Sequence, residues 1–150
     1  MISQSTDNLF DLKVDALAHG CNTQGIMNAG ISREFRERYP KMYKEYRDYC
    51  KSGNFNVGDV HFYESREEKP HVINIAVQFD THTGAILEYI EGGLLKIEEL
   101  YRGWEIKSLG IPHIGCGLGN LKWGDVREVV RKIFGTSDLE VIVTSGRKPL

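Results

Sequence analysis

The stretch VDALAHGCNTQGIMNAGI, residues 14–31, places three structural signals in direct succession. Residues 14–19 form a short apolar run that stops at a glycine, which is typical of a buried strand. A glycine-containing loop over 20–29 follows. From residue 30 to residue 51 apolar side chains recur at helical spacing, with an interruption at Pro40. A strand, a glycine loop and a helix in this order indicate one unit of an α/β fold.

Beyond this unit, strand and helix patterns alternate to the end of the chain. Runs rich in β-branched and aromatic residues predict strands at 59–63, 72–77, 106–111 and 139–144. Apolar residues at three- to four-residue spacing predict amphipathic helices at 85–102 and 123–134. Gly92 and Gly93 cost the first of these helices about 1 kcal/mol each relative to alanine, which is tolerable where a helix packs closely against a sheet. The alternation predicts an α/β sandwich with helices on both faces.

The composition is that of an ordinary globular domain. Of 150 residues 41% are hydrophobic, and 19 Lys and Arg against 21 Asp and Glu give a net charge of −2. We expect one domain over residues 1–150, and not a strongly basic DNA-coating protein. No apolar run approaches the ~20 residues that span a bilayer, so no membrane partner is expected. Three widely spaced cysteines and no visible secretory signal suggest a reducing, cytoplasmic location, and neither a metal nor a cofactor is expected.

Ligands of α/β sheets bind at the carboxyl ends of the strands, which directs attention to three loops. The first loop, 19–31, contains Gly20, Gly25 and Gly30 and leads into a helix. Such glycines let backbone N–H groups approach an anion, and the helix N-terminus adds partial positive charge. The alternative is a plain strand-to-helix turn in which Asn22 only satisfies the backbone.

The second loop, 112–120, has glycine at every second position from Gly115 to Gly119. It is not a dinucleotide-binding fingerprint, because Asn120 stands where the last glycine would be, and it lacks the lysine of a Walker A loop. Two glycine loops at one edge of a sheet predict an anionic ligand, such as a diphosphate, held mainly by backbone amides.

Titratable side chains near these loops are candidates for acid–base chemistry. Asp80 and His82 lie within reach of one another in the third loop, 78–84, although Asp80 or Thr83 could simply cap the following helix. His19 ends an apolar strand, where a histidine is more often a satisfied core residue than a catalyst. The basic segment 33–51 is the one place where a nucleic-acid contact could be argued, although most such segments are solvated helix faces.

Four segments share their order and spacing with a known family: Asp7–Phe10, Leu17–Ile31, Ile111–Gly119 and the Leu-x-Trp at 121–123. They resemble the macrodomain family, which binds ADP-ribose. The likeness is greatest to the branch that contains terminal ADP-ribose protein glycohydrolases, antitoxins that strip ADP-ribose from DNA, and yeast-type ADP-ribose-1″-phosphate phosphatases. The resemblance implies a three-layer α/β/α sandwich around a mixed, mostly parallel sheet of about six strands.

The resemblance also implies where a ligand binds. The segment around Asn8 would contact the adenine, Asn22 the hydroxyls of the distal ribose, and the two glycine loops the diphosphate and distal ribose. The residues implied as ligand contacts are Asn8, Leu9, His19, Asn22, Gly25, Ile26, Met27, Asn28, Ala29, Gly30, Ile31, Ile114, Gly115, Cys116, Gly117, Leu118 and Gly119.

Departures from the family pattern shape the expected reaction. The chain departs from the glycohydrolases of this branch at two positions. Gln78 stands where those enzymes have a lysine, and Gly119 stands about where the protein glycohydrolases have an aspartate. Phosphatase-like members, in contrast, share a histidine at the position of His19. We therefore expect an ADP-ribose-binding macrodomain that hydrolyses a derivative such as ADP-ribose-1″-phosphate, with His19 and Asp80 as catalytic candidates. The alternatives are a non-catalytic ADP-ribose reader and an ADP-ribosyl glycohydrolase that acts on modified DNA or protein.

Overall fold

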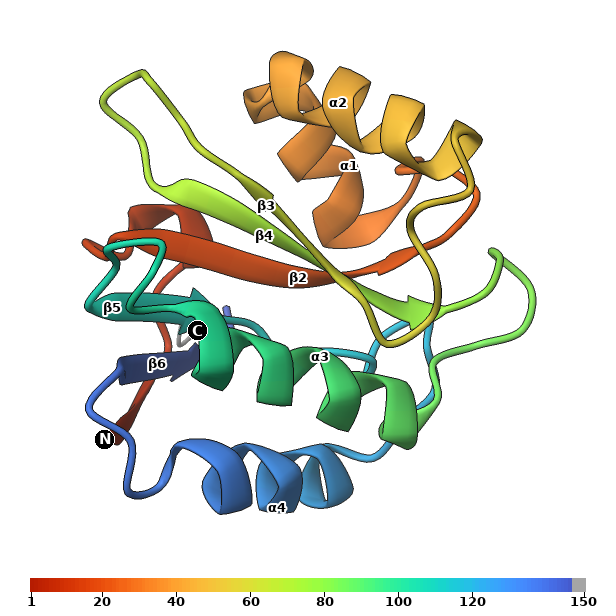
Figure 1. Ribbon diagram of the computed structural model, residues 1–150. Helices are drawn as coiled ribbons and strands as arrows, with labels where there is room; N and C mark the ends of the chain where they lie inside the picture. The colour runs from red at the N-terminus through yellow and green to blue at the C-terminus, as the bar shows by residue number, and fades with distance from the viewer. Residues whose placement is uncertain (147–150) are drawn as a thin grey trace.

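A six-stranded mixed sheet forms the middle of the molecule in the computed structural model, which describes residues 1–146 (Figure 1). Its strands are β1 (Ile2–Ser5), β2 (Ala16–Asn22), β3 (Val60–Tyr63), β4 (His71–Gln78), β5 (Ser108–Ile111) and β6 (Glu140–Thr144). The order across the sheet is β1-β6-β5-β2-β4-β3, and every neighbouring pair is parallel except β3 and β4. The predicted sheet of about six, mostly parallel strands is confirmed.

Helices cover both faces of this sheet, as Figure 1 shows. One face carries α1 (Gly30–Arg38) and α2 (Pro40–Lys51), and the other carries α3 (Leu87–Leu100) and α4 (Trp123–Phe134). Pro40 is the first residue of α2, so the predicted interruption of the 30–51 segment is the junction between two helices. The three-layer α/β/α sandwich is thereby confirmed.

The face under α3 and α4 has a core of aliphatic and aromatic side chains. Ile90, Leu94 and Ile97 of α3 are fully buried against the sheet. Gly93 allows this close approach, because a Cβ at this position would overlap Cγ2 of Ile75 on β4. The predicted reason for the glycine pair in this helix is confirmed at Gly93.

The face under α1 and α2 has a separate core. Phe35, Met42 and Tyr46 of the two helices are fully buried together with Leu17 and Val72 of the sheet. Residues of β2 alternate between the two cores, so that odd-numbered side chains from Leu17 to Cys21 point toward α1 and α2.

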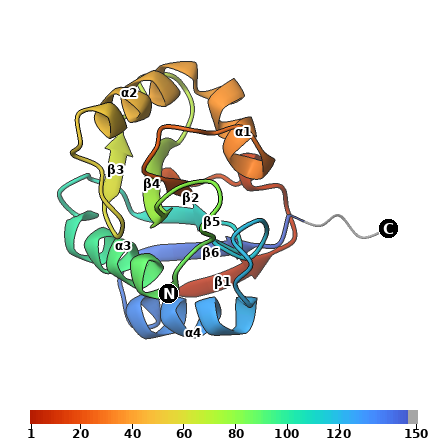
Figure 2. The same ribbon diagram turned by 90° about the vertical axis from the view of Figure 1, so that its right-hand side faces the viewer.

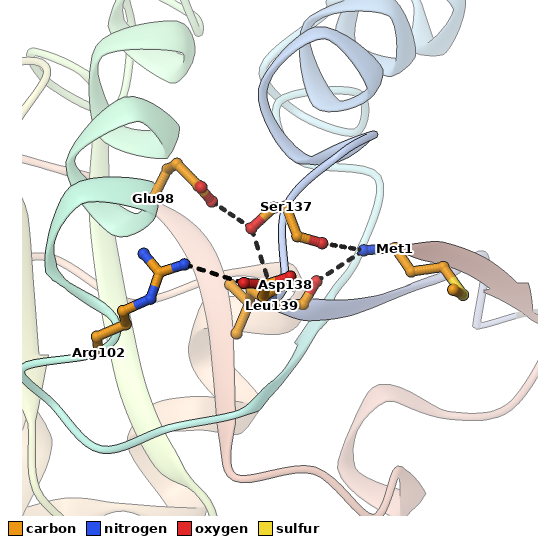
Figure 3. Close-up of polar contacts among 6 residues, drawn as sticks. All are labelled: Met1, Glu98, Arg102, Ser137, Asp138 and Leu139. Carbon is orange, nitrogen blue, oxygen red and sulfur yellow. Dashed lines mark hydrogen bonds and ion pairs between the residues drawn. The ribbon is translucent and has the colours of Figure 1, made fainter.

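Two differences between the predicted and the observed strands concern β2 and β1. Strand β2 continues three residues past His19, because Gly20 does not end it: a side chain there would meet Val77 at 2.9 Å, so this glycine serves strand packing. Strand β1 was not predicted at all. It pairs with β6, and Figure 3 shows the amino nitrogen of Met1 bonded to the carbonyl oxygens of Ser137 (2.7 Å) and Leu139 (3.0 Å).

Helix α3 and the turn that follows it are tied to the segment before β6 by two further contacts in Figure 3. The Ser137 hydroxyl donates to the carboxylate of Glu98 at 2.6 Å, and Arg102 forms an ion pair with Asp138 at 3.3 Å.

No helix within residues 1–146 has the length and apolar character to span a membrane.

The five parallel strands end at one rim of the sheet, which faces the viewer in Figure 2. The β2–α1, β4–α3 and β5–α4 connections all leave from this rim. The three loops that the sequence singled out are therefore neighbours in space.

A candidate ligand-binding cleft at the rim of the sheet

A cleft of about 1030 Å³ lies at the rim where β2, β4, β5 and β6 end. Both glycine loops line it, together with the segment that follows β6. Most of the residues implied as ligand contacts are in its wall: Asn8, Leu9, Asn22, Ile26, Asn28, Ala29, Gly30, Ile31, Ile114, Gly115, Gly117, Leu118 and Gly119. The two glycine loops thus line one and the same cleft.

The first loop is shaped by the amide of Asn22 at the end of β2. Its Oδ1 accepts from the N–H of Gln24 at 2.9 Å and from the hydroxyl of Tyr46 at 3.1 Å, and its Nδ2 donates to the carbonyl of Ile26 at 2.9 Å. The side chain therefore holds the loop in place, and one Nδ2 hydrogen is left for a ligand.

Helix α1 begins at the cleft without a side-chain cap. Its N-cap residue is Ala29, which has no acceptor, and Gly30 follows with a left-handed φ of 58°. The first N–H groups of a helix have no partner within it, and they carry the positive end of the helix dipole. This end of α1 is suited to hold a phosphate group of a ligand in the cleft.

The second loop is folded tightly enough to require glycine. A Cβ at Gly119 would lie 2.6 Å from the carbonyl oxygen of Gly115 and 2.9 Å from Cβ of Ala85. An aspartate at position 119 does not fit this conformation. The N–H groups of Gly117 and Leu118 make no hydrogen bond within residues 1–146, so they are available to a ligand.

The cleft contains no cationic side chain among the described residues. Its one carboxylate belongs to Glu34, which lies 3.9 Å from Arg38 and is half-exposed. An anion bound here would be held by backbone N–H groups and helix dipoles rather than by Lys or Arg.

His19, which the sequence predicted as a ligand contact, does not line the cleft. Its ring is fully buried, stacks on Phe35 with centroids 3.9 Å apart, and donates from Nε2 to Oδ1 of Asn74 at 2.7 Å. Its Nδ1 lies 3.1 Å from the Ser32 hydroxyl, which does line the cleft. Burial lowers the pKa of His19 to about 4, opposed by the Asn74 hydrogen bond. The imidazole is therefore neutral at pH 7, and it is connected to the cleft through two lining residues, Ser32 and Cys21, whose Sγ lies 3.5 Å from Nε2.

A buried polar chain extends from His19 across the α1–α2 face of the sheet, from β2 over β4 and β3 to α2. Asn74 donates from Nδ2 to Nδ1 of His61 at 3.0 Å, and His61 donates from Nε2 to Glu45 at 2.9 Å. Burial lowers the pKa of His61, and the Glu45 carboxylate raises it. We call Ser32, His19, Asn74, His61 and Glu45 the polar chain. Its geometry assigns one tautomer to each imidazole, with the proton on Nε2.

Asp80 also lies outside the cleft wall. Its Oδ1 accepts from the N–H groups of His82 (2.8 Å) and Thr83 (2.9 Å), and these hydrogen bonds lower its pKa. Since α3 begins at Leu87, Asp80 closes its own turn and does not cap the helix. Gln78 does line the cleft, and its amide donates to the carbonyl of Asp80 at 2.6 Å.

Three further predicted contacts lie off the cleft. Met27 is packed in the α1–α2 core, and Gly25 is covered by Arg47 and accepts at its carbonyl from Tyr43 at 3.1 Å. Cys116 turns toward the carbonyl of Ile114, and partial burial raises the pKa of its thiol, which makes it a weaker nucleophile.

The cleft also has residues that the sequence did not single out as ligand contacts. They lie at strand ends or in the first turn of α1, a position that the rule for α/β sheets would have indicated. These are Gly20, Cys21, Ser32, Glu34, Val77, Gln78, Thr81, Pro112, His113, Thr144, Ser145 and Gly146.

Within residues 1–146, no group of three or more His, Cys, Asp and Glu side chains is arranged to hold a metal ion.

Residues 18–130 match the sequence profile of the Macro domain family. The chain therefore belongs to this family. The macrodomain of Mycobacterium tuberculosis DarG has the same fold, with a TM-score of 0.91 at 28% identity, and the match covers 96% of this chain and 97% of that one.

Two kinds of curated relative are similar to the chain in sequence. A DNA ADP-ribosyl glycohydrolase of Mycobacterium tuberculosis is 31% identical over 89% of this chain, which spans only 39% of that protein's length. An ADP-ribose 1″-phosphate phosphatase of Meyerozyma guilliermondii is 25% identical over 83% of this chain and 89% of its own length. Thermosipho africanus DarTG, solved in complex with ADP-ribose, shares the fold with a TM-score of 0.88 at 22% identity, covering 99% of this chain and 43% of that one.

Proposed function

We propose that this chain binds ADP-ribose or a derivative of it in the cleft. The observation that carries the proposal is a cleft between two glycine loops, with uncapped N–H groups and, among residues 1–146, no cationic side chain in its wall. Such a cleft suits a diphosphate held by backbone amides. Its relatives include enzymes named for acting on ADP-ribosyl groups. The proposed ligand has a diphosphate between an adenosine and a ribose, and the cleft extends along the rim from the end of β4 to the end of β6.

We place the adenosine at the end of the cleft near Asn8 and Ser145, and the distal ribose at the end near Asn22 and Gln78. Asn22 and Gln78 are paired across β2 and β4 at the rim, so their amides can address the hydroxyls of one sugar. The N-terminus of α1 and the second loop lie between, where the diphosphate belongs.

Titration calorimetry with ADP-ribose tests the binding. Gly119→Ala is expected to weaken it at least tenfold, because the new Cβ would overlap the Gly115 carbonyl and displace the second loop. Gly124→Ala is the matched control, since a Cβ there meets nothing within 4 Å, and it should bind as the wild type does. Absence of heat and of a thermal shift with wild-type protein would overturn the proposal.

The reaction we propose is hydrolysis of ADP-ribose 1″-phosphate. A water oxygen attacks the phosphorus, the bond from phosphorus to the C1″ oxygen breaks, and ADP-ribose and inorganic phosphate leave. The phosphatase relatives support this reaction because they match the chain over most of their own length. The side chains of His19 and Asp80 lie outside the cleft wall, so we assign them positioning roles: His19 orients Ser32, and Asp80 orders the third loop.

Phosphate release from ADP-ribose 1″-phosphate is the direct assay. We expect turnover by the wild type and reduced turnover after Ser32→Ala, Gln78→Ala, Asp80→Ala or His19→Ala, in each case with the melting temperature measured in parallel. Tight binding of ADP-ribose without any phosphate release would identify a reader instead.

Removal of ADP-ribose from DNA is a second candidate function, favoured by a cationic patch beside the first loop. The guanidinium groups of Arg36 and Arg47 both lie over the ring of Tyr43, at 5.6 and 5.7 Å, and Tyr43 is bonded to the loop at Gly25. Stacked arginine and tyrosine side chains suit single-stranded nucleic acid. Gln78 opposes this candidate, because an amide cannot form a Schiff base or supply a positive charge. The test is incubation with ADP-ribosylated DNA: release of ADP-ribose would support this second function, and no release would contradict it.

A further inference from the structure

A second cavity, of about 500 Å³, adjoins the cleft at the same rim. Its wall is formed by the carboxyl ends of β1 and β6 and by the first two turns of α4. His113 and Ser145 line both cavities, so the two cavities are adjacent. The Trp123 of the Leu-x-Trp motif, which the proposed function leaves without a role, lines the second cavity and stacks on His113 with centroids 4.0 Å apart.

The second cavity differs from the cleft in its charge. Arg127, one turn after Trp123 on α4, lines it, whereas no cationic side chain lines the cleft within residues 1–146. The described wall of the second cavity has no carboxylate. The ion pairs of α4 are made further along the helix, by Arg131 with Glu128 and by Lys132 with Glu91.

The guanidinium of Arg127 is incompletely satisfied. Its Nε is buried, and no hydrogen-bond partner for it exists within residues 1–146. A buried donor without a partner costs folding free energy, and its retention is explained when a ligand supplies the acceptor. Guanidinium groups pair with phosphate oxygens through two parallel N–H bonds.

Hydroxyl and amide groups complete the wall opposite α4. Gln4, Ser5 and Thr6 lie at the end of β1, and the Ser5 hydroxyl oxygen already accepts from the N–H of Asp7 at 3.0 Å. Its proton is therefore free to be donated to an anion. A guanidinium and hydroxyl donors, without a competing carboxylate, form a site for a phosphate monoester.

We propose that this second cavity binds a phosphate group carried on the adenosine ribose of the ligand in the cleft, with Arg127 as its counter-ion. The proposal rests on the proposed function, which puts the adenosine at the Asn8 and Ser145 end of the cleft. Ser145 lines both cavities, so a substituent on that ribose has a short path from one to the other. The protein would then prefer ADP-ribose 2′-phosphate to ADP-ribose.

Comparing two ligands on one protein tests this. By calorimetry, wild-type protein should bind ADP-ribose 2′-phosphate about tenfold more tightly than ADP-ribose, as expected for a charge-assisted hydrogen-bonded contact. In Arg127→Gln the ratio of the two affinities should fall to near one. Arg131→Gln, which removes an exposed arginine one turn further along α4, should keep the wild-type ratio.

A second measurement does not depend on a variant that folds. In the ¹H–¹⁵N spectrum of arginine side chains, the Nε–H signal of Arg127 should shift on adding ADP-ribose 2′-phosphate and stay in place with ADP-ribose. Inorganic phosphate alone is the third probe. If it shifts this signal fully while the two ligands bind equally, the site takes free phosphate and the assignment to an adenosine phosphate is wrong.

Equal affinity of wild-type protein for the two ligands, with the Arg127 signal unmoved by all three probes, would overturn the second site and leave ADP-ribose binding intact. If neither ligand binds at all, the proposed function fails and the second site, which rests on it, fails with it. The two failures are thus distinguishable in one titration series.

Discussion

The two faces of the sheet are packed in different ways. Under α3 and α4 the contacts are aliphatic and aromatic, with Leu94 and its neighbours fully buried. Under α1 and α2 the same sheet holds the polar chain, in which His19, Asn74 and His61 are buried and bonded to one another. Hydrophobic burial is strong and non-directional, whereas a hydrogen-bonded chain is weaker but fixes orientation. Both faces bury an apolar core that contributes stability, and the face under α1 and α2 also holds the polar chain, which sets the position of Ser32 at the cleft.

Leu94→Ala should have the largest effect on stability. Leu94 is completely buried, so its truncation should lower the free energy of unfolding by about 3 kcal/mol. Denaturant unfolding gives this value, and ADP-ribose affinity of the folded protein should be unchanged. Leu95→Ala is the matched control, because Leu95 is 51% exposed and its loss should cost less than about 0.5 kcal/mol.

Asn74→Ala should lower the free energy of unfolding less than Leu94→Ala does, and it should also weaken ligand binding in the cleft. It leaves Nε2 of His19 and Nδ1 of His61 without partners, which costs about 1–3 kcal/mol. Because His19 then loses its orientation, Ser32 should lose its position and ADP-ribose should bind severalfold more weakly. Unchanged affinity in folded Asn74→Ala protein would contradict the division of roles between the faces. Asn54→Ala, at an exposed turn, should change neither quantity.

Acid should destabilise the polar face. The folded-state pKa of His19 is about 4 against 6.5 in its unfolded form, so the unfolded chain binds the extra proton between these values. The contribution of neutral His19 to the free energy of unfolding is thus fully present above pH 6.5. It is lost as pH falls toward 4, by about 1.4 kcal/mol per pH unit. Unfolding free energies between pH 7 and pH 4.5 measure this slope. His61, whose pKa is also lowered, adds a slope of the same sign, and His19→Gln should remove only its own part.

Glu45→Gln should have the smallest effect. Glu45 ends the polar chain at the surface, where its side chain is 55% exposed and solvent screens its charge. The loss should be about 0.5 kcal/mol or less, with ligand affinity unchanged. A loss as large as that of Asn74→Ala would show that the polar chain depends on its surface end.

Helices were the most predictable part of the fold. The spacing of apolar residues and Pro40 gave α1, α2 and α4 with their boundaries, because helix periodicity and proline act locally. Strand β1 escaped prediction since its four residues, ISQS, lack an apolar pattern and are fixed by pairing with β6. Local sequence carries no information about such a partner.

The candidate site was predictable to the level of its loops and less so for individual side chains. Glycine spacing located the two cleft loops, whereas the direction of His19 depends on the alternation within β2. Counting from the apolar Leu17 would have placed His19 under α1, on the same face as Leu17. Arg127 could not be identified from the sequence, because the cavity it lines is completed by β1, a strand far away in the chain.

Within residues 1–146 no cationic side chain lines the cleft, and its two glycine loops offer main-chain N–H groups to an anion. Truncation to alanine leaves main-chain donors in place, so an alanine scan across Ile26, Ile31 and Leu118 would report little about recognition. Ligand recognition depends instead on the backbone conformation of the two loops. Substitutions that add atoms, such as those at glycine, change this conformation and therefore test recognition. Sequence drift at apolar wall positions such as these three can therefore proceed with little loss of ligand affinity.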